Sequence, residues 1–252
     1  MIAEQRLSKI LQIISEQGFV EISDLSERLN VSAMTIRRDL QKLSERGIIR
    51  RKYGGAMLVA NISAENDYYF KKEQNLSSKQ HLAQIALSLI HDNDILFLDA
   101  GTTTFELACL LQKKQNLTII TNDLAIMLEL AKKDIQVLSL GGVLQNSTLS
   151  TIGPISVENL RHYQATTAFL GANAISSNYD VLTPTPDKAY LKKVAMDVSQ
   201  KSYLMVDSSK FNSYALNRYA NLSDFTAVIT DRVFSQEEQL RLNKYYINIL
   251  SV

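Results

Sequence analysis

The stretch Ser32-Ala33-Met34-Thr35-Ile36-Arg37-Arg38-Asp39-Leu40-Gln41-Lys42-Leu43 divides into an apolar side and a polar side when it is drawn as a helix. Ile36, Leu40 and Leu43 recur at intervals of four and three residues, which is the spacing of a narrow apolar stripe on an amphipathic helix. Ser32 is a favourable N-cap residue, so the helix is expected to begin directly after it. The stretch therefore predicts a short helix that packs against a core by one side.

The polar side of the same helix is rich in groups that bind DNA. Thr35, Arg37 and Arg38 fall in its first two turns, away from the apolar stripe or at its margin. A helix that begins with one hydroxyl and two guanidinium groups is typical of the recognition helix of a helix-turn-helix, which enters the major groove by that end. The predicted DNA-binding residues of this helix are Ser32, Thr35, Arg37 and Arg38.

The neighbouring segments complete a winged helix-turn-helix. Upstream, the spacing of apolar residues predicts a helix over residues 7–14 that Gly18 ends, and Ser23 is expected to cap a second short helix. Asn30-Val31 supplies a tight turn before the recognition helix. Downstream, strand-like runs at 48–53 and 56–58 flank a predicted turn at Gly54-Gly55. We therefore predict an N-terminal all-α winged helix-turn-helix domain over residues 1–57, with this hairpin as the wing.

Charge is concentrated in this part of the chain. Residues 27–52 hold eight Lys or Arg against three Asp or Glu, whereas the whole chain has a net charge of only +1. Clustered cations neutralise DNA phosphates, so Arg51 and Lys52 on the predicted wing are expected to contact the DNA backbone. The alternative is a solvated basic surface, which the agreement of caps, helix order and hairpin disfavours.

Length and composition limit the remaining possibilities. With 252 residues and 46% hydrophobic content, the chain is expected to form one or two ordinary globular domains. No apolar run is long enough to cross a membrane and no signal peptide is recognisable, so we expect a cytoplasmic protein without a membrane partner. The single cysteine and three scattered histidines predict no metal site, and no cofactor is expected.

Residues 58–76 are predominantly polar and are predicted to be a linker, although Tyr68-Tyr69-Phe70 is expected to dock on a domain or on another subunit. From residue 77 to 252, short apolar runs alternate with helical patterns. Apolar strands that alternate with helices predict an α/β domain with a largely parallel sheet covered on both faces. The seven predicted strands are 95–99, 117–121, 135–140, 165–170, 203–207, 226–230 and 246–250.

Small and polar residues follow several of these strands, at the edge where open α/β sheets bind ligands. In Asp99-Ala100-Gly101-Thr102-Thr103-Thr104, a strand end leads through a glycine to three hydroxyls at the start of a helix, which predicts a phosphate cradle. Helix capping alone is the competing interpretation, and a nucleotide P-loop is excluded because its Gly-Lys-Ser/Thr signature is missing. The predicted ligand-binding residues at these strand ends are Asp99, Gly101, Thr102, Thr103, Thr121, Asn122, Asp123, Gly141, Gly142, Gly171, Asp207 and Lys210.

Residues 3–57 resemble the winged helix-turn-helix of DeoR-type bacterial transcriptional regulators, through Val31-Ser32-x-x-Thr35-Ile36-Arg37-Arg38-Asp39-Leu40. Residues 77–235 resemble the sensor domain of that family, which is similar to ribose-5-phosphate isomerase and related sugar-phosphate-binding folds. The resemblance implies a repressor of a carbohydrate uptake or catabolism operon, released from operator DNA by a phosphorylated sugar. Two features depart from the family pattern: Gly171-Ala172-Asn173-Ala174 lacks the usual Asp-Gly, and Lys188 replaces a commonly acidic residue.

Alternatives to a repressor remain open at this point. A sugar-phosphate isomerase with a DNA-binding appendage would use Asp99, Asp123, Asp207 and Lys210 as acid, base and electrostatic clamp, but no distinctive catalytic constellation supports an enzyme. An activator is also compatible with the sequence, because the sign of regulation depends on operator position. A single recognition helix covers too few base pairs for a unique site, so we expect a homodimer or homotetramer.

Overall fold

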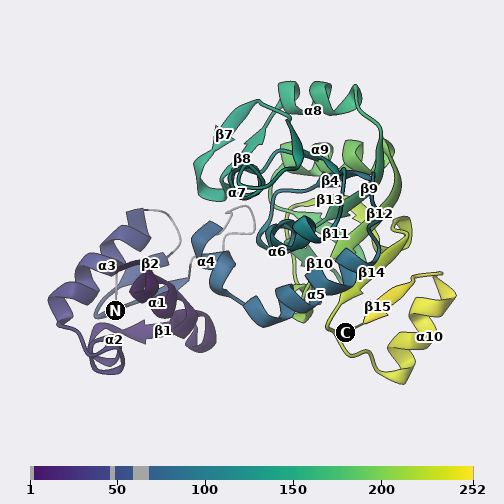
Figure 1. Cartoon of the computed structure of the whole chain (residues 1–252). Coiled ribbons are helices and arrows are strands. Elements are labelled where there is room, and N and C mark those ends of the chain that lie inside the picture. Colours follow the sequence, from purple (N-terminus) through teal and green to yellow (C-terminus); the bar gives the residue numbers. More distant parts are fainter. Residues whose placement is uncertain (1–2, 46–48, 59–67, 252) are drawn as a thin grey trace. The chain divides into compact units, whose positions relative to one another are not determined.

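The computed structural model describes residues 3–45, 49–58 and 68–251. The chain divides into two compact units, residues 1–74 and residues 75–252. Each unit has its own hydrophobic core, and Figure 1 colours them along the chain from purple to yellow.

Three helices of the N-terminal unit follow the predicted order, namely α1 (Ala3–Gln17), α2 (Ile22–Leu29) and α3 (Ala33–Glu45). The predicted stop at Gly18 is confirmed, because this residue has φ +76° and its N–H donates to the carbonyl of Ile14 at 2.8 Å. Asn30 adopts the left-handed conformation in the turn before α3. The predicted Ser23 cap is wrong: α2 begins at Ile22, and its N-cap position is Glu21, two residues before Ser23.

The wing is part of a three-stranded antiparallel sheet of order β1-β3-β2, in which β1 (Phe19–Glu21) was not predicted. Strands β2 (Ile49–Lys52) and β3 (Gly55–Leu58) pair with Lys52 opposite Gly55, so the two-residue turn is Tyr53-Gly54 and not the predicted Gly54-Gly55. Gly54 supplies the positive φ of +79° in this turn. Gly55 is required for another reason, since a Cβ there would lie 2.2 Å from the carbonyl oxygen of Val20 in β1.

The recognition helix packs by the stripe that its sequence predicts, since Ile36, Leu40 and Leu43 are all buried in the core of this unit. Asp39 is buried as well, and its carboxylate accepts from Nε of Arg6 at 2.5 Å and from Nη2 at 3.2 Å, which ties α3 to α1. Residues 68–73 of the predicted linker form helix α4 (Tyr68–Glu73). The ring of Phe70 is buried in the same core, as expected of a docked aromatic residue.

The C-terminal unit is built on a seven-stranded parallel sheet of order β15-β14-β12-β9-β4-β5-β6. All seven predicted strands are present, with ends that shift by a few residues. Their bounds are β4 (Ile95–Leu98), β5 (Thr118–Thr121), β6 (Gln136–Ser139), β9 (Ala165–Leu170), β12 (Ser199–Met205), β14 (Ala227–Thr230) and β15 (Ile249–Ser251).

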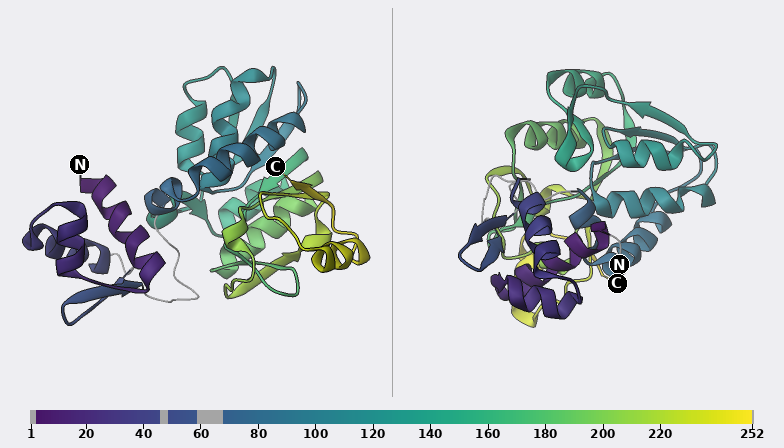
Figure 2. Two further views of the ribbon diagram at one scale, coloured as in Figure 1. Left: turned by 90° about the horizontal axis from the view of Figure 1, so that it is seen from below. Right: turned by 90° about the vertical axis from the view of Figure 1, so that its left-hand side faces the viewer.

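Helices cover both faces of this sheet, as the apolar strands predict (Figure 2). Successive residues of one strand serve opposite cores: Leu96 and Leu98 of β4 pack on one side and Phe97 on the other. The first side is covered by α5 (Leu76–Ser88), α6 (Thr102–Leu110) and α7 (Leu124–Leu130). The second side is covered by α8 (Pro154–Arg161), α9 (Pro186–Asp197) and α10 (Gln236–Lys244).

Several smaller elements had no prediction. An antiparallel hairpin, β7 (Val143–Gln145) and β8 (Ser150–Ile152), leads into α8, which was also missed. A second antiparallel sheet contains β10 (Ala174–Ile175), β11 (Asp180–Thr183) and β13 (Asn217–Asn221). None of the helices within residues 3–45, 49–58 and 68–251 could span a membrane.

Candidate functional site

The predicted DNA-binding residues of α3 lie at its N-terminal end. The Oγ of Ser32 accepts the N–H of Thr35 at 3.2 Å, and the two hydroxyl oxygens are 3.0 Å apart. This contact confirms Ser32 as the cap of the recognition helix. The side chains of Arg37 and Arg38 are exposed. Both side chains are therefore accessible, with Arg38 opposite the buried stripe of α3 and Arg37 at its margin.

The wing cations are exposed on β2, but one of them is held by the recognition helix. Nη1 of Arg51 donates to the side-chain oxygen of Gln41, whose amide nitrogen in turn donates to Glu45 at 2.8 Å. This chain of contacts joins β2 to α3. Lys52, the last residue of β2, is exposed beside the hairpin turn.

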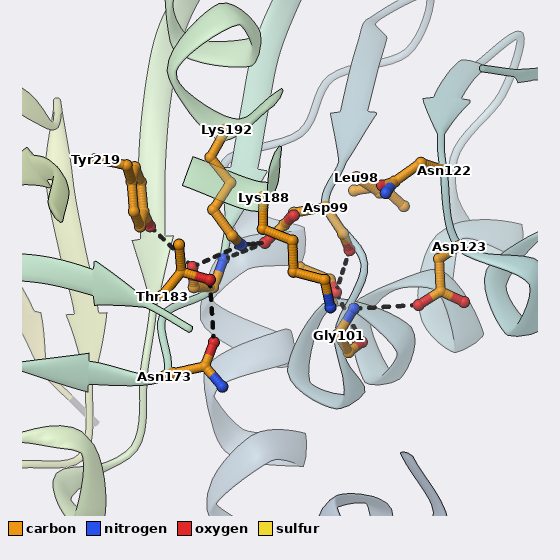
Figure 3. A network of polar contacts seen from close by, with 12 residues as sticks. Leu98, Asp99, Gly101, Asn122, Asp123, Asn173, Thr183, Lys188, Lys192 and Tyr219 are labelled. Atoms are coloured by element: carbon orange, nitrogen blue, oxygen red, sulfur yellow. Dashed lines mark hydrogen bonds and ion pairs between the residues drawn. The ribbon is translucent and has the colours of Figure 1, made fainter. Parts of the chain in front are cut away.

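The second candidate site lies at the carboxyl edge of the central strands of the C-terminal unit (Figure 3). Strands β5, β4 and β9 are neighbours, so the residues that follow them come together. Asp99 follows β4 and is 3% exposed, and its Oδ2 accepts the N–H of Gly171, which follows β9, at 2.9 Å. Asp123, two residues beyond β5, accepts the N–H of Gly101 at 3.1 Å. The structure thus brings together the residues predicted after these three strands.

Lys192 of α9 completes this cluster and was not predicted. Its Nζ forms a buried ion pair with Oδ2 of Asp99 and donates to the carbonyl of Gly171 at 3.0 Å. The ring of Tyr219 lies 5.5 Å from this nitrogen, and its hydroxyl donates to the same carbonyl at 2.8 Å. Burial raises the pKa of Tyr219 well above its usual range, so this hydroxyl keeps its proton. A lysine between the apolar residues Leu191 and Val194 was the available signal for a buried cation.

Asp123 has an unusual environment for a carboxyl group. It is fully buried and caps α7 by accepting the N–H of Ile126 at 2.9 Å. Burial raises its pKa to about 7, although hydrogen bonds from the N–H groups of Ile126, Ala125 and Gly101 act in the opposite direction. The charge of Asp99 adds a smaller upward contribution to the pKa. Asp123 therefore changes its charge near neutral pH.

The three threonine hydroxyls at the start of α6 are not all available to bind a ligand. Oγ1 of Thr104 donates to the carbonyl oxygens of Asp99 and Gly101, at 2.7 and 2.8 Å, so the expectation of three available hydroxyls is wrong for this residue. Thr121 is buried too, and its hydroxyl donates to the carbonyl of Leu98 at 2.7 Å. Thr102 and Thr103 occupy the first turn of α6, where backbone N–H groups lack intrahelical acceptors.

A second lysine of α9 also reaches this edge. Nζ of Lys188 is buried and donates to Oγ1 of Thr148, in the segment between β7 and β8, at 3.1 Å. The same hairpin holds Asn122, whose side-chain nitrogen donates to the carbonyl of Thr151 at 2.8 Å. Figure 3 shows both lysines extending from α9 toward the turn that contains Asp99 and Gly101.

The remaining predicted residues lie on the outer strands. Gly141 and Gly142 follow β6, and a Cβ at Gly142 would lie 2.3 Å from Oγ of Ser156, so this glycine is needed for packing. Asp207 follows β12 and accepts from Asn75 at 3.1 Å, while Lys210 lies half-buried in the next turn. In the part of the chain that the structure describes, no hydrogen bond or ion pair joins Asp207 or Lys210 to the Asp99 cluster.

A winged helix-turn-helix combined with an α/β unit that gathers polar groups at one sheet edge defines a DNA-binding regulator with a sensor domain. Residues 6–61 match the family model described as the DeoR-like helix-turn-helix domain, and residues 74–232 match the DeoR C terminal sensor domain. The chain belongs to the DeoR family of transcriptional regulators. This is a family of regulators, so the isomerase alternative is not supported.

Relatives match along nearly the whole chain. The uncharacterized HTH-type transcriptional regulator FruR of Bacillus subtilis (strain 168) is 33% identical over 245 residues, which cover 97% of this chain and 96% of the relative. The lactose phosphotransferase system repressor of Staphylococcus aureus (strain N315) is 32% identical over 250 residues and covers 98% of both chains. The putative aga operon transcriptional repressor of Escherichia coli O157:H7 is 31% identical over 251 residues, which are 98% of this chain and 93% of the relative.

Solved structures are similar over part of the chain. Ribose 5-phosphate isomerase a from Methanocaldococcus jannaschii aligns with a TM-score of 0.41 and 16% identity, over 55% of each chain.

Proposed function

We propose that this protein represses an operon for carbohydrate uptake or breakdown and leaves its operator when a phosphorylated sugar binds the C-terminal unit. Two relatives along nearly the whole chain are named as a lactose phosphotransferase system repressor and a putative aga operon repressor, which supports the carbohydrate assignment. The observation that carries the proposal is the joint presence of Lys188, Lys192 and the start of α6 at one sheet edge.

The proposed anion site uses backbone and side-chain donors together. The N–H groups of Thr102 and Thr103 lie at the positive end of the α6 dipole, which favours a phosphate. Lys188 and Lys192 both bring an amino group to this edge, and Lys192 is paired there with Asp99. Hydrogen bonds to the sugar hydroxyls are assigned to Asn122 and to the carboxyl groups of Asp99 and Asp123. The other proposed effector contacts are Gly101, Thr121, Gly141, Gly142, Gly171, Asp207 and Lys210.

The proposed DNA site is formed by the N-terminal turns of α3 and by the wing. Arg37 and Arg38 are assigned to base edges, and Ser32 and Thr35 to nearby bases or phosphates. Arg51 and Lys52 are assigned to phosphates. A homodimer or homotetramer would present two recognition helices to two half-sites. The sign of regulation follows from operator position and is tested by reporter expression in a deletion strain.

The test is release of operator DNA in a titration with sugar phosphates, followed by fluorescence anisotropy of a duplex from upstream of the neighbouring carbohydrate operon. We expect one phosphorylated sugar to release the DNA and the corresponding free sugar to fail, because a charge-assisted contact contributes about 1.5–3 kcal/mol. Equal responses to the phosphorylated and free sugars would contradict the phosphate site. No response to any sugar phosphate would contradict the effector assignment.

Two variants test the location of the effector site. Lys188→Gln and Lys210→Ala are each expected to bind operator like the wild type and to need more effector for release, because an effector acts only through its differential affinity for the two states. Lys193→Gln is the control, since Lys193 lies on the same helix but is exposed. A wild-type response in Lys188→Gln would exclude the proposed sheet edge, and one in Lys210→Ala would remove that residue from the site.

A further inference from the structure

The ring of Tyr53 is the most exposed large hydrophobic group among the residues that the structure describes. It occupies the first position of the two-residue wing turn and is 107% exposed, as in an extended chain. Such a ring makes no contribution to the core of the N-terminal unit. Its immediate neighbours on β2 are Arg51 and Lys52, which are both exposed.

Tyr53 stands at the rim of a groove on the same unit. The groove has a volume of about 880 Å³ and lies between the C-terminal half of α3, β1 and the wing. Its lining combines cations, polar side chains and two aromatic rings: Phe19, Gln41, Ser44, Arg51, Lys52 and Tyr53.

The backbone of the wing explains why the Phe19 ring lines this groove. Because Gly55 has no Cβ, strand β1 approaches β3 closely, and a Cβ at this position would lie 2.7 Å from Cζ of Phe19. The Phe19 ring therefore lies over Gly55, 40% exposed. The bond from Arg51 to Gln41 holds the opposite wall, so the wing and α3 keep a defined spacing.

We propose that the Tyr53 ring packs on a deoxyribose of the bound duplex DNA, at the rim of this groove. The inference rests on the proposed DNA-binding function and extends it to an uncharged contact. The excess of positive charge on β2 is complementary to DNA, and the hydroxyl of Ser44 suits a phosphate oxygen. The ring has apolar surface to bury against a sugar, and sugars are the apolar part of the DNA backbone.

An uncharged contact is distinguishable from a cationic one by its salt dependence. Loss of a lysine or arginine contact lowers the slope of log affinity against log salt by about one unit, because one fewer counterion is released. Loss of the Tyr53 ring removes an apolar contact and leaves the number of counterions released on DNA binding unchanged. Contact with sugars is also independent of base sequence, so it affects cognate and shuffled DNA equally.

The experiment measures binding of the full-length protein to an operator duplex and to a shuffled duplex, over about 50 to 200 mM salt. We expect Tyr53→Ala to weaken binding about tenfold on both duplexes with an unchanged salt slope. Tyr53→Phe keeps the ring and is expected to bind like the wild type. Tyr214→Ala is the matched control, because this tyrosine is 70% exposed in the C-terminal unit.

Four outcomes would overturn the inference while leaving DNA binding established. These are wild-type affinity in Tyr53→Ala, a loss confined to the operator, an equal loss in Tyr53→Phe and Tyr53→Ala, and a lowered salt slope in Tyr53→Ala. Circular dichroism of each variant checks that the fold is retained. If the wild-type protein binds neither duplex, the proposed function fails, and the inference fails with it.

Discussion

The Nζ atom of Lys192 donates to the carboxylate of Asp99, and both side chains are buried at the carboxyl edge of the parallel sheet. The two residues are 93 positions apart and come from helix α9 and the end of strand β4. The pair shares its environment with Gly171, whose N–H donates to Asp99 and whose carbonyl accepts from Lys192. The ion pair therefore joins three segments of the proposed effector site.

Removing one partner of this pair is expected to destabilise the C-terminal unit. Lys192→Met leaves the Asp99 carboxylate buried without its cation, which costs about 3–5 kcal/mol of unfolding free energy. The double variant Asp99→Asn/Lys192→Met is expected to lose less, because no charge remains buried. Urea denaturation followed by circular dichroism measures both. The exposed Lys193→Met is the control, and an equally small loss in Lys192→Met and Lys193→Met would contradict a buried ion pair.

Arg38 is expected to matter for DNA binding and not for folding, since its side chain is exposed on α3. Arg38→Ala should weaken operator binding by about 1–3 kcal/mol if the guanidinium group holds a base edge through two hydrogen bonds. Anisotropy titrations with an operator duplex give this affinity, and Lys201→Ala serves as an exposed cation of the other unit. Wild-type affinity in a folded Arg38→Ala protein would remove Arg38 from the DNA site.

Lys52 is expected to contact a phosphate from the end of β2. Lys52→Ala should weaken binding to operator and shuffled duplexes alike and lower the salt slope by about one unit. The measurement is a salt titration of binding to both duplexes. A loss that occurs only on the operator would instead indicate that the wing reads bases.

Asp123 predicts a dependence of stability on pH. Its pKa is about 7 in the folded protein, above the usual value of 3.8, so between these values the folded protein binds a proton that the unfolded chain does not. This contribution to stability is complete below about pH 4 and is lost as the pH rises through about 7. Asp123→Asn removes the titration while its amide oxygen can still cap α7.

The measurement is the unfolding free energy of wild type and Asp123→Asn at several pH values between about 4 and 8. The unfolding free energy of the variant should rise relative to that of the wild type as the pH rises. Taking the difference between the two proteins cancels the contributions of the other carboxyl groups. Parallel pH profiles for the two proteins would show that Asp123 does not titrate in this range.

Local patterns in the sequence were sufficient for much of the architecture. The stripe of Ile36, Leu40 and Leu43 and the cap at Ser32 predicted α3, because helical spacing and capping depend only on neighbouring residues. Continuous apolar runs predicted the seven parallel strands, since a strand buried on both faces is apolar throughout. The antiparallel strands β1, β7, β8, β10, β11 and β13 were missed because none of them contains more than two consecutive apolar residues, so they lack the continuous apolar run that marks the parallel strands.

Tertiary structure decided which residues meet at the carboxyl edge of the parallel sheet. Asp99, Asp123 and Gly171 meet because β5, β4 and β9 are neighbours in the sheet, and no local pattern specifies strand order. Lys192 joins them from α9, where its sequence context resembles an ordinary amphipathic helix. Burial and the pKa of Asp123 follow from that assembly. Local sequence thus determined the recognition helix and the strands of the parallel sheet, and long-range packing decided which charges face one another.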